Sequence, residues 1–571
     1  MDFTVTGGNK NAEIKLSKKY DGDILYLTIN LNLPSPEIPE PMKINWSFSA
    51  KDCGSIWGPS TLDHGLFFDW GMFTVNSRLA SWMPVEQIIS NSGKNKLLIA
   101  VSDVDTPMAV KAGIHEEDAT FSCEIELFTR PTFPVDKYCA TVRLDMRDTP
   151  YYDSIYDAVD WWENECGYKA AYVPESARMP MDSLWYSFHQ QLDIEEILKE
   201  CRVSKELGLE TVIIDDGWQT DDNGRGYAYC GDWEPAPSKV GDMVSLVDEL
   251  HKIGMKVVLW YSVPFMGQFA ARYDEFKNML LDGVGNADTS FALDPRYKKV
   301  RDYLVSVYES AVRDWHLDGL KLDFIDNFAL KGKSLEFDER RDFQSLEQAL
   351  HKLMSDIKES LTAINPDILI EFRQSYVGPS IRKYGNMLRV GDCACDYQRN
   401  KSGVINLRMT SGKTAVHSDM IMWNTLDTPE NAALQFASIL YGVPQVSVRV
   451  DKLPESHYKM LSFYIDFWKK HREVLLDGKL TAENPECNYS SACSTLGNKS
   501  VATVYSNPVV TITTDEAAVV NASKHQSLIL KGAKGKAFEA VNCMGETVSS
   551  GAVSGNLEEI EVPTSGIIFI K

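Results

Sequence analysis

The 571-residue chain is poor in basic residues for its length. Lys and Arg total 58 against 81 Asp and Glu, which gives a formal net charge of −23. Nucleic-acid binding needs a basic surface that neutralises phosphates, so neither DNA nor RNA is an expected partner. The chain also lacks any run of about 18 uncharged apolar residues, so we expect no transmembrane helix and no membrane partner.

The chain lacks the marks of a secreted protein. Its 11 cysteines are odd in number and scattered, which argues against a disulfide framework and favours a reducing compartment. The first residues, MDFTVTGGNK, contain neither the basic nor the apolar region of a signal peptide. We therefore expect a cytoplasmic protein, the alternative being a signal peptide removed before residue 1.

Signatures of bound cofactors are missing as well. No G-x-G-x-x-G follows an expected strand, which disfavours a dinucleotide fold. His is scarce, with 10 in the chain, and neither H-x-H nor H-E-x-x-H occurs. Cys393 and Cys395 form a C-x-C pair without a second pair nearby, so a zinc site is not expected. We expect no metal and no cofactor.

The hydrophobic pattern divides the chain into four segments. Residues 1–150 contain short apolar runs broken by Gly, Pro and Asn, such as Ile24–Leu31, which predicts an antiparallel β-sandwich. Residues 151–180 form a connector with an amphipathic stretch. From residue 477 to 571 the helical period stops, and strand-like runs between turns predict a small C-terminal β-sandwich.

Residues 181–476 alternate short apolar strands with amphipathic helices. Eight strands are expected, at 183–188, 210–214, 256–261, 319–324, 368–372, 386–390, 415–423 and 445–450. Continuous apolar runs are typical of parallel strands buried on both faces. The segment is therefore predicted to be a (β/α)8 TIM barrel, which makes the chain an α/β protein with a sandwich at each end. A doubly wound open sheet is the alternative.

Polar residues gather where the predicted strands end, which is where a TIM barrel carries its active site. They are Asp215, Asp216, Trp260, Lys321, Asp323, Glu371, Arg373, Arg389, Asp392, His417 and Asp419. So many carboxylates serve either a metal cluster or glycoside cleavage. The interleaved Lys and Arg favour glycoside cleavage, because cations keep carboxylates ionised and repel a metal ion.

Two carboxylates are suited to a retaining mechanism. Lys321 and Asp323 are two residues apart on a strand and point to one face, so the ammonium should lower the pKa of Asp323 and maintain a nucleophile. Asp392 follows a different strand and can approach from across the site as the acid/base. For that role its pKa should be raised by negative neighbours.

Six motifs then resemble a known family. They are WYSF (185–188), IIDDGWQ (213–219), GDWEP (231–235), VVLWYSVPF (257–265), LKLDF (320–324) and RVGD (389–392). In this order they are similar to the glycoside hydrolase family 36 α-galactosidases, or melibiases, of clan D. The resemblance implies a sandwich–barrel–sandwich layout and a retaining, exo-acting α-galactosidase that hydrolyses terminal α-D-galactosyl residues of oligosaccharides.

The resemblance also assigns roles to individual residues. It implies that Asp323 is the nucleophile and Asp392 the acid/base, while Asp215 and Asp216 bind the 4- and 6-hydroxyls of galactose. The remaining expected substrate-binding residues are Lys321 and Arg389 on the 2- and 3-hydroxyl side, Arg373, and the aromatic walls Trp185, Trp218, Trp233 and Trp260.

Departures from the family pattern keep alternatives open. Only Val390 and Gly391 separate Arg389 from Asp392, where the family often has three residues; Asp396 is therefore a competitor for the acid/base role. On strand five the segment IEFRQSY (370–376) replaces a Cys-, Ser- or Gly-rich segment. An α-N-acetylgalactosaminidase, an α-glucosidase, a metal-dependent barrel enzyme and a non-catalytic sugar-binding protein remain alternatives, and a homo-oligomer is compatible with the sequence.

Overall fold

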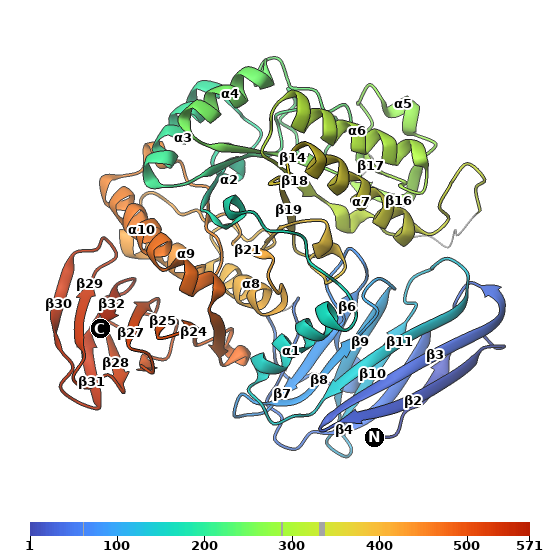
Figure 1. Ribbon diagram of the computed structural model, residues 1–571, viewed down its shortest axis with the longest axis horizontal. Coiled ribbons are helices and arrows are strands. Elements are labelled where there is room, and N and C mark those ends of the chain that lie inside the picture. The colour runs from blue at the N-terminus through green and yellow to red at the C-terminus, as the bar shows by residue number, and fades with distance from the viewer. Residues whose placement is uncertain (61, 287–288, 331–336) are drawn as a thin grey trace.

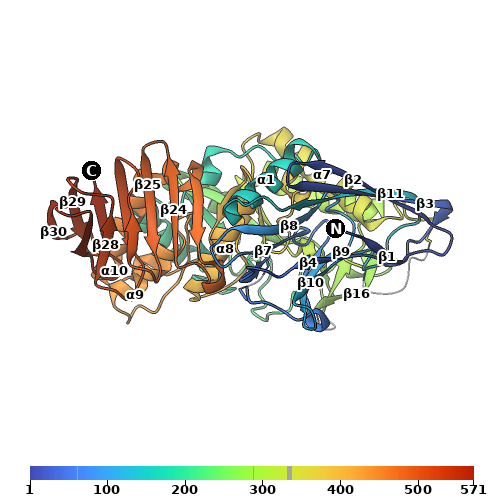
Figure 2. The same cartoon turned by 90° about the horizontal axis from the view of Figure 1, so that it is seen from below.

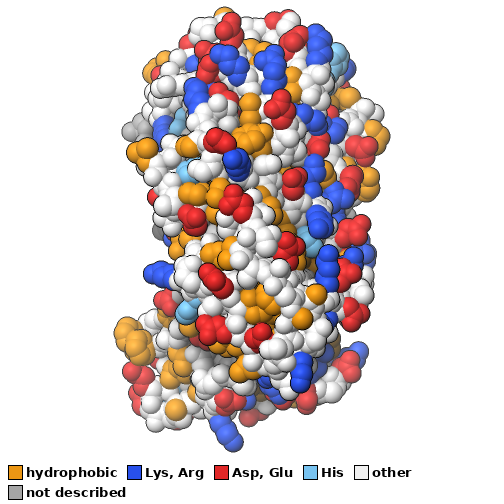
Figure 3. Space-filling view, turned by 90° about the vertical axis from the view of Figure 1, so that its left-hand side faces the viewer, with side chains coloured by type: hydrophobic (Ala, Val, Ile, Leu, Met, Phe, Trp, Pro, Cys, Tyr) orange, Lys and Arg blue, Asp and Glu red, His pale blue; other side chains and the backbone are white. Residues whose placement is uncertain are grey.

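The computed structural model describes residues 1–60, 62–286, 289–330 and 337–571. Figure 1 shows the barrel in the upper part of the view, with the N-terminal sandwich at its lower right and the C-terminal sandwich at its lower left, and Figure 2 shows the same two sandwiches from below, on the right and on the left. On the face that Figure 3 shows, acidic and basic side chains are interspersed, without a continuous basic patch. In the part of the chain that the structure covers, no helix combines the length and the apolarity needed to cross a membrane.

The N-terminal sandwich packs a five-stranded sheet, in the order β1-β4-β10-β9-β6, on a six-stranded sheet, in the order β2-β3-β11-β8-β7-β5. Burial alternates along β3, as expected for a strand with one face on a core. The strands are β1 (Thr4–Gly7), β2 (Glu13–Asp21), β3 (Ile24–Glu37), β4 (Met42–Ser49), β5 (Ser55–Trp57), β6 (Phe73–Ser77), β7 (Val85–Ile89), β8 (Asn95–Val101), β9 (Met108–His115), β10 (Thr120–Leu127) and β11 (Val135–Asp145). Helix α1 (Tyr151–Asn164) then leads to the barrel.

The barrel is an eight-stranded parallel sheet in the order β21-β20-β19-β18-β14-β13-β12-β22. Parallel bridges from His417 to Val443 and from Ile421 to Val446 join its two ends. The strands are β12 (Met181–Ser183), β13 (Thr211–Ile214), β14 (Lys256–Ser262), β18 (Gly319–Asp323), β19 (Leu369–Arg373), β20 (Met387–Arg389), β21 (Ala415–His417) and β22 (Gln445–Val446). The predicted TIM barrel is confirmed.

Helices surround this barrel, and several begin and end as the sequence predicts. The Asp193 side chain accepts from the Glu196 amide at 3.1 Å, and Gly208 closes the same helix with a φ of 93°. The helices are α2 (Leu184–Phe188), α3 (Ile194–Leu207), α4 (Met243–Ile253), α5 (Tyr273–Phe276), α6 (Lys298–Asp314), α7 (Leu346–Ile364), α8 (Tyr397–Thr410), α9 (Pro429–Ser438) and α10 (Glu455–Asp477). A three-stranded sheet of β15 (Phe265–Gly267), β16 (Leu280–Asn286) and β17 (Ser290–Leu293) is inserted after β14.

The first barrel strand differs from the prediction. The aromatic run at 184–188 is the short helix α2, and the strand lies before it at Met181–Ser183. Leu184 and Phe188 are four residues apart and both buried, while the residues between them are half-exposed. One buried face with this spacing is the pattern of a helix, so the predicted strand at 183–188 is wrong.

The C-terminal sandwich packs a seven-stranded sheet, in the order β23-β24-β25-β27-β32-β29-β30, on the three-stranded sheet β26-β28-β31. Its strands are β23 (Lys479–Glu483), β24 (Ser491–Leu496), β25 (Lys499–Val504), β26 (Val509–Thr511), β27 (Glu516–Asn521), β28 (Ser527–Lys531), β29 (Ala537–Val541), β30 (Thr547–Ala552), β31 (Leu557–Glu561) and β32 (Ile567–Ile570). Helix α10 contacts β24 and β25 and so attaches this sandwich to the barrel.

Candidate active site

The carboxyl ends of the barrel strands bring the predicted polar residues together. Asp215 and Asp216 directly follow β13, Lys321 and Asp323 lie on β18, and Arg373 ends β19. All but Arg373, which is half-buried, are less than 9% exposed. A buried polar cluster needs internal partners, and its hydrogen bonds identify what each group can do.

Asp323 is surrounded by donors. Its Oδ1 accepts from Arg373 Nε at 2.6 Å, the Tyr376 hydroxyl at 3.1 Å and the Phe324 amide at 2.8 Å. Among the described residues, its Oδ2 accepts only one hydrogen bond, from Trp260 Nε1 at 3.0 Å. Burial alone raises the pKa of Asp323, but the cations of Arg373 and Lys321 outweigh it and hold the pKa well below its usual value. The carboxylate is therefore ionised, and Oδ2 is the less occupied oxygen.

Lys321 lowers the pKa of Asp323, as the sequence predicts, but without contacting it. Its ammonium pairs with Asp215 Oδ2 at 2.6 Å, while Arg373 is the cation in direct contact with Asp323. Residues two apart on a strand do share a face, but Asp215, which follows β13 on the far side of β14, is the carboxylate that Lys321 contacts. Lys321 acts on Asp323 only through its longer-range charge.

Asp216 is fixed in the same site by two glutamine side chains. Its carboxylate accepts from Gln190 Nε2 and from Gln219 Nε2, each at 2.7 Å. Burial raises the pKa of Asp216 to about 6, the Gln219 hydrogen bond opposes the shift, and the charge of Asp215 adds to it. Neither glutamine was among the predicted residues, although Gln219 lies in the motif IIDDGWQ.

Arg389 is a buried cation that contacts three carboxylates. It pairs with Asp392 at 2.9 Å, with Glu371 at 3.4 Å and with Asp419. Asp419 in turn accepts from the Tyr186 hydroxyl at 3.0 Å and from the Cys393 amide at 2.7 Å. These bonds fix the loop that carries Asp392, whose own side chain is 60% exposed.

The pKa of Asp392 shifts in the direction opposite to the prediction. Desolvation by the surrounding chain raises it, but the charges of Arg389 and Lys321 outweigh this and lower the pKa below its usual value. The negative neighbour Asp323 opposes them without prevailing. In the free protein the expected proton donor is therefore ionised.

Asp396 has a structural role that the sequence did not reveal. Its side chain caps α8 by accepting from the Arg399 amide at 3.0 Å, and it lies 3.7 Å from the Arg399 guanidinium. A carboxylate at a helix N-terminus is stabilised as an anion. His417 is also structural, because its Nε2 lies 2.8 Å from the Ala177 carbonyl and burial lowers its pKa to about 4.

The predicted aromatic walls need correction. Trp218 has no exposed surface, and Trp233 is 4% exposed; their rings stack with centroids 6.1 Å apart. Trp218 Nε1 also donates to the Trp260 carbonyl at 2.8 Å. Both rings therefore support the site from behind instead of facing a ligand, because a closed aromatic cluster leaves no ring face for a sugar.

Two other aromatic rings lie beside Trp260. Trp260 itself contacts Asp323, as described above. The Tyr227 ring stacks on the Trp260 ring, with the two ring centroids 6.0 Å apart. The Phe324 ring packs edge-on against the Tyr227 ring, with the two ring centroids 5.0 Å apart. Both of these rings are half-exposed. Trp185 is half-exposed too, with the Arg225 guanidinium 5.9 Å from its ring. Tyr227 was missed because it lies in an irregular loop without hydrophobic periodicity.

A cavity of about 460 Å³ opens beside Asp392, between the N-terminal sandwich and the barrel. Pro59, Ser60 and Trp82 line it from the sandwich, and Gln374 and Asp392 from the barrel. The Trp82 amide donates to the Ser375 carbonyl at 2.6 Å, which joins the two walls. Among the described residues, no group of three or more His, Cys, Asp or Glu side chains is arranged to hold a metal ion.

Removing the charge of Arg373 should shift the pH profile. In Arg373→Gln the pKa of Asp323 should rise, because the cation in contact with its Oδ1 is lost. Activity that needs ionised Asp323 falls as the pH drops through this pKa, so the acidic limb of kcat/KM on a nitrophenyl α-galactoside should move to higher pH. Tyr376→Phe, which removes a neutral donor shared by the same oxygen and the Leu322 carbonyl, is the matched control. If the acidic limb of kcat/KM lies at the same pH in Arg373→Gln and in the wild type, the electrostatic role of Arg373 is contradicted.

Comparisons with known proteins identify relatives of the chain. Alpha-galactosidase Mel36A of Lactobacillus acidophilus is 27% identical over 179 residues, which cover 29% of this chain and 23% of that protein. Alpha-galactosidase AgaA of Geobacillus stearothermophilus is 22% identical over 316 residues, covering 52% of this chain and 41% of its own. The matches thus span less than half of either relative.

The fold is shared with a solved structure. The family 36 α-galactosidase AgaA of Geobacillus stearothermophilus, in complex with raffinose, aligns with 98% of this chain and 81% of its own at a TM-score of 0.66 and 13% identity. The resemblance to family 36 that the motifs predicted is confirmed. The Melibiase family model matches residues 180–478, which is more than half of the chain, and the protein belongs to the melibiase family.

Proposed function

We propose that the protein is a retaining, exo-acting α-galactosidase that hydrolyses terminal non-reducing α-D-galactosyl residues of oligosaccharides. The observation that carries this proposal is Asp323 at the end of β18, whose pKa is held low and whose Oδ2 accepts a hydrogen bond only from Trp260 among the described residues. The relatives named above are α-galactosidases, and one was solved with raffinose. No step of the mechanism below needs a cofactor.

The first step would form a covalent intermediate. Asp323 Oδ2 attacks the anomeric carbon as the bond to the leaving oxygen breaks, and Asp392 gives its proton to that oxygen. Arg373 and Tyr376 hold the other oxygen of Asp323, and Trp260 steers the attacking one. The second step reverses the roles, because Asp392 takes a proton from the water that attacks the galactosyl ester.

The low pKa of Asp392 in the free protein has a consequence for this cycle. Sugar hydroxyls that engage Arg389 and exclude water would weaken the Arg389–Asp392 pair at 2.9 Å, and the pKa of Asp392 would then rise into the range of an acid. Esterification of Asp323 removes a negative neighbour that raises this pKa. The pKa then falls again, which suits a base in the second step.

The sugar would be fixed by the buried carboxylates on the opposite side. Asp215 and Asp216 present oxygen acceptors at the end of β13, which would bind the 4- and 6-hydroxyls of galactose, and the Lys321 ammonium, paired with Asp215, would donate on the 2- and 3-hydroxyl side. The leaving group would occupy the cavity beside Asp392.

The proposal is tested with the wild-type protein and three nitrophenyl α-glycosides, those of galactose, N-acetylgalactosamine and glucose. We expect turnover of the galactoside, with kcat/KM at least about 100-fold above the other two, because a site built to hydrogen-bond one hydroxyl discriminates strongly against its absence. Proton NMR should show α-galactose as the first product. Initial release of β-galactose would exclude retention. If the enzyme prefers another of the three glycosides, the sugar of that glycoside replaces galactose as the proposed substrate.

A further inference from the structure

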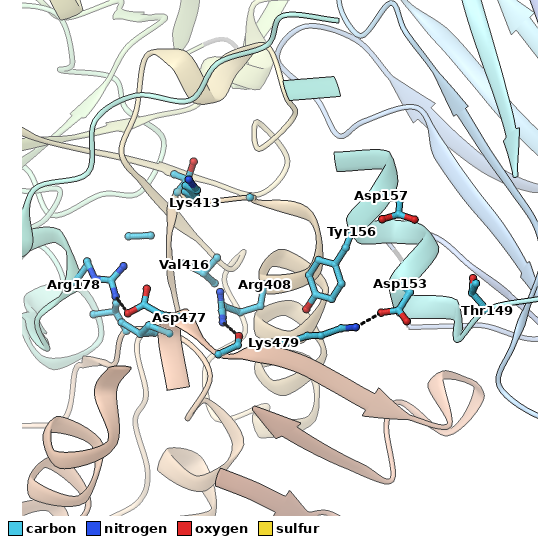
Figure 4. Close-up of a pocket in the computed structure, with 16 residues that line it drawn as sticks. Thr149, Asp153, Tyr156, Asp157, Arg178, Arg408, Lys413, Val416, Asp477 and Lys479 are labelled. Carbon is cyan, nitrogen blue, oxygen red and sulfur yellow. Dashed lines mark hydrogen bonds and ion pairs between the residues drawn. The ribbon is translucent and has the colours of Figure 1, made fainter. Parts of the chain in front are cut away.

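A second cavity, of about 770 Å³, lies at the end of the barrel opposite Asp323 (Figure 4). Its wall includes Ala415 at the start of β21 and Val443 just before β22, whereas the candidate active site lies beyond the strand ends. Helix α1, the last turn of α8 and the first residues of β23 complete the wall. The volume is in the range of small-molecule sites, and three parts of the chain meet there.

The acidic side chains of this wall are all neutralised. The pairs are Arg178–Asp477 at 2.6 Å, Lys479–Asp153 at 2.6 Å and Arg147–Asp157 at 2.5 Å. Figure 4 shows the first two pairs as dashed contacts along the edge of the cavity. Each of these carboxylates therefore already has a cation in contact with it.

Two cations of the wall lack an acidic partner. Arg408 Nη2 donates only to the backbone carbonyls of Leu475 and Gly478, at 3.2 and 3.3 Å, and its solvent-inaccessible Nε has no partner among the described residues. Burial lowers the pKa of Arg408, and the charges of Tyr156 and Asp477 oppose this shift without prevailing. Lys413, which is exposed beside the cavity, has no ion pair with any described residue. Burying a guanidinium without a carboxylate in contact with it is unfavourable.

A buried hydroxyl completes the set of donors. Thr414 is 3% exposed and lines the cavity, and its Oγ1 has no hydrogen-bond partner in the described part of the chain. Guanidinium, ammonium and hydroxyl donors are the groups that bind phosphate oxygens in proteins. The Thr149 and Tyr156 side chains line the rest of the space and offer polar surface to the organic part of a ligand.

We propose that this cavity binds a small organic phosphate, with its phosphate group at Arg408, Lys413 and Thr414. A lone phosphate would leave much of the volume of about 770 Å³ empty, so an organic group fits beside it. The bound anion would supply the counter-charge that Arg408 lacks and would join α8 to the connector and the C-terminal sandwich.

The test is isothermal titration of the full chain with glucose 6-phosphate, inorganic phosphate and glucose at matched ionic strength. We expect saturable binding of glucose 6-phosphate, weaker binding of inorganic phosphate and none of glucose. Arg408→Gln should weaken binding by about tenfold or more, because charge-assisted hydrogen bonds are lost. Lys413→Ala and Thr414→Val should each weaken it by a smaller factor. Lys10→Ala, which removes one charge from an exposed site in the N-terminal sandwich, should bind as wild type does.

Absence of saturable binding of glucose 6-phosphate would overturn the proposal, and so would binding of equal strength in wild type and all three cavity variants. If Arg408→Gln does not fold, Lys413→Ala and Thr414→Val decide the question, since neither side chain has a partner to lose. Binding is measured without turnover, so the result is independent of the proposed glycosidase activity.

Discussion

Asp323→Ala should lower kcat on p-nitrophenyl α-D-galactoside by about 10⁴-fold or more, because the variant lacks the oxygen proposed to form the covalent intermediate. Adding azide should restore product formation, since a small anion fits the space left by the carboxylate and attacks from the same side. The product should be β-galactosyl azide, identified by NMR. This outcome would establish the nucleophile and the stereochemistry together.

The control for this variant is Asp367→Ala, the same chemical change on the exposed loop before β19. It should keep wild-type activity. Thermal unfolding of both variants separates loss of chemistry from loss of fold. Wild-type turnover by Asp323→Ala, or azide rescue that yields the α-azide, would remove Asp323 from the nucleophile role.

Asp392→Ala should show an effect that depends on the leaving group. Raffinose has a poor leaving group that needs a proton, so kcat/KM on raffinose should fall by about 10³-fold. Nitrophenolate leaves without a proton, so the first step should remain fast on the nitrophenyl galactoside while the covalent intermediate accumulates. Azide should then attack that intermediate and give α-galactosyl azide, the opposite anomer to that expected for Asp323→Ala.

Asp396→Ala distinguishes the two carboxylates of this loop. Loss of the α8 cap should lower the free energy of unfolding by about 1 kcal/mol and leave turnover of both substrates nearly unchanged. If Asp396→Ala shows the leaving-group dependence and Asp392→Ala does not, the acid/base assignment moves to Asp396.

The sequence was sufficient to predict the barrel and the residues at the carboxyl ends of its strands. Short continuous apolar runs end at Asp215, Lys321 and Asp323. In a parallel sheet these side chains must lie at the same end, whichever way the side chains pack. The motif order then identifies the family. Such information is local, because each strand and the residue after it are read from a few consecutive positions.

Contacts between side chains of different strands could not be predicted from such local information. Lys321 contacts Asp215, which is 106 positions away, and Arg373 reaches Asp323 from 50 positions away; only the folded sheet decides which cation meets which carboxylate. The pKa of Asp392 was mispredicted for the same reason, since it depends on the Arg389 contact. Trp218 was misplaced because a Trp beside a catalytic motif can pack in a core as readily as face a sugar.

One contact in the interior also limits how this architecture can be rearranged in evolution. Trp57 of the N-terminal sandwich donates its Nε1 to Asn406 of α8 at 3.3 Å and to the Tyr489 hydroxyl of the C-terminal sandwich at 3.1 Å. Asn406 also lines the cavity beside Asp392. A sandwich exchanged by recombination would have to bring a partner for both residues, or leave buried polar groups unsatisfied next to the leaving-group space. The three parts of this chain are therefore constrained to diversify together and not as interchangeable modules.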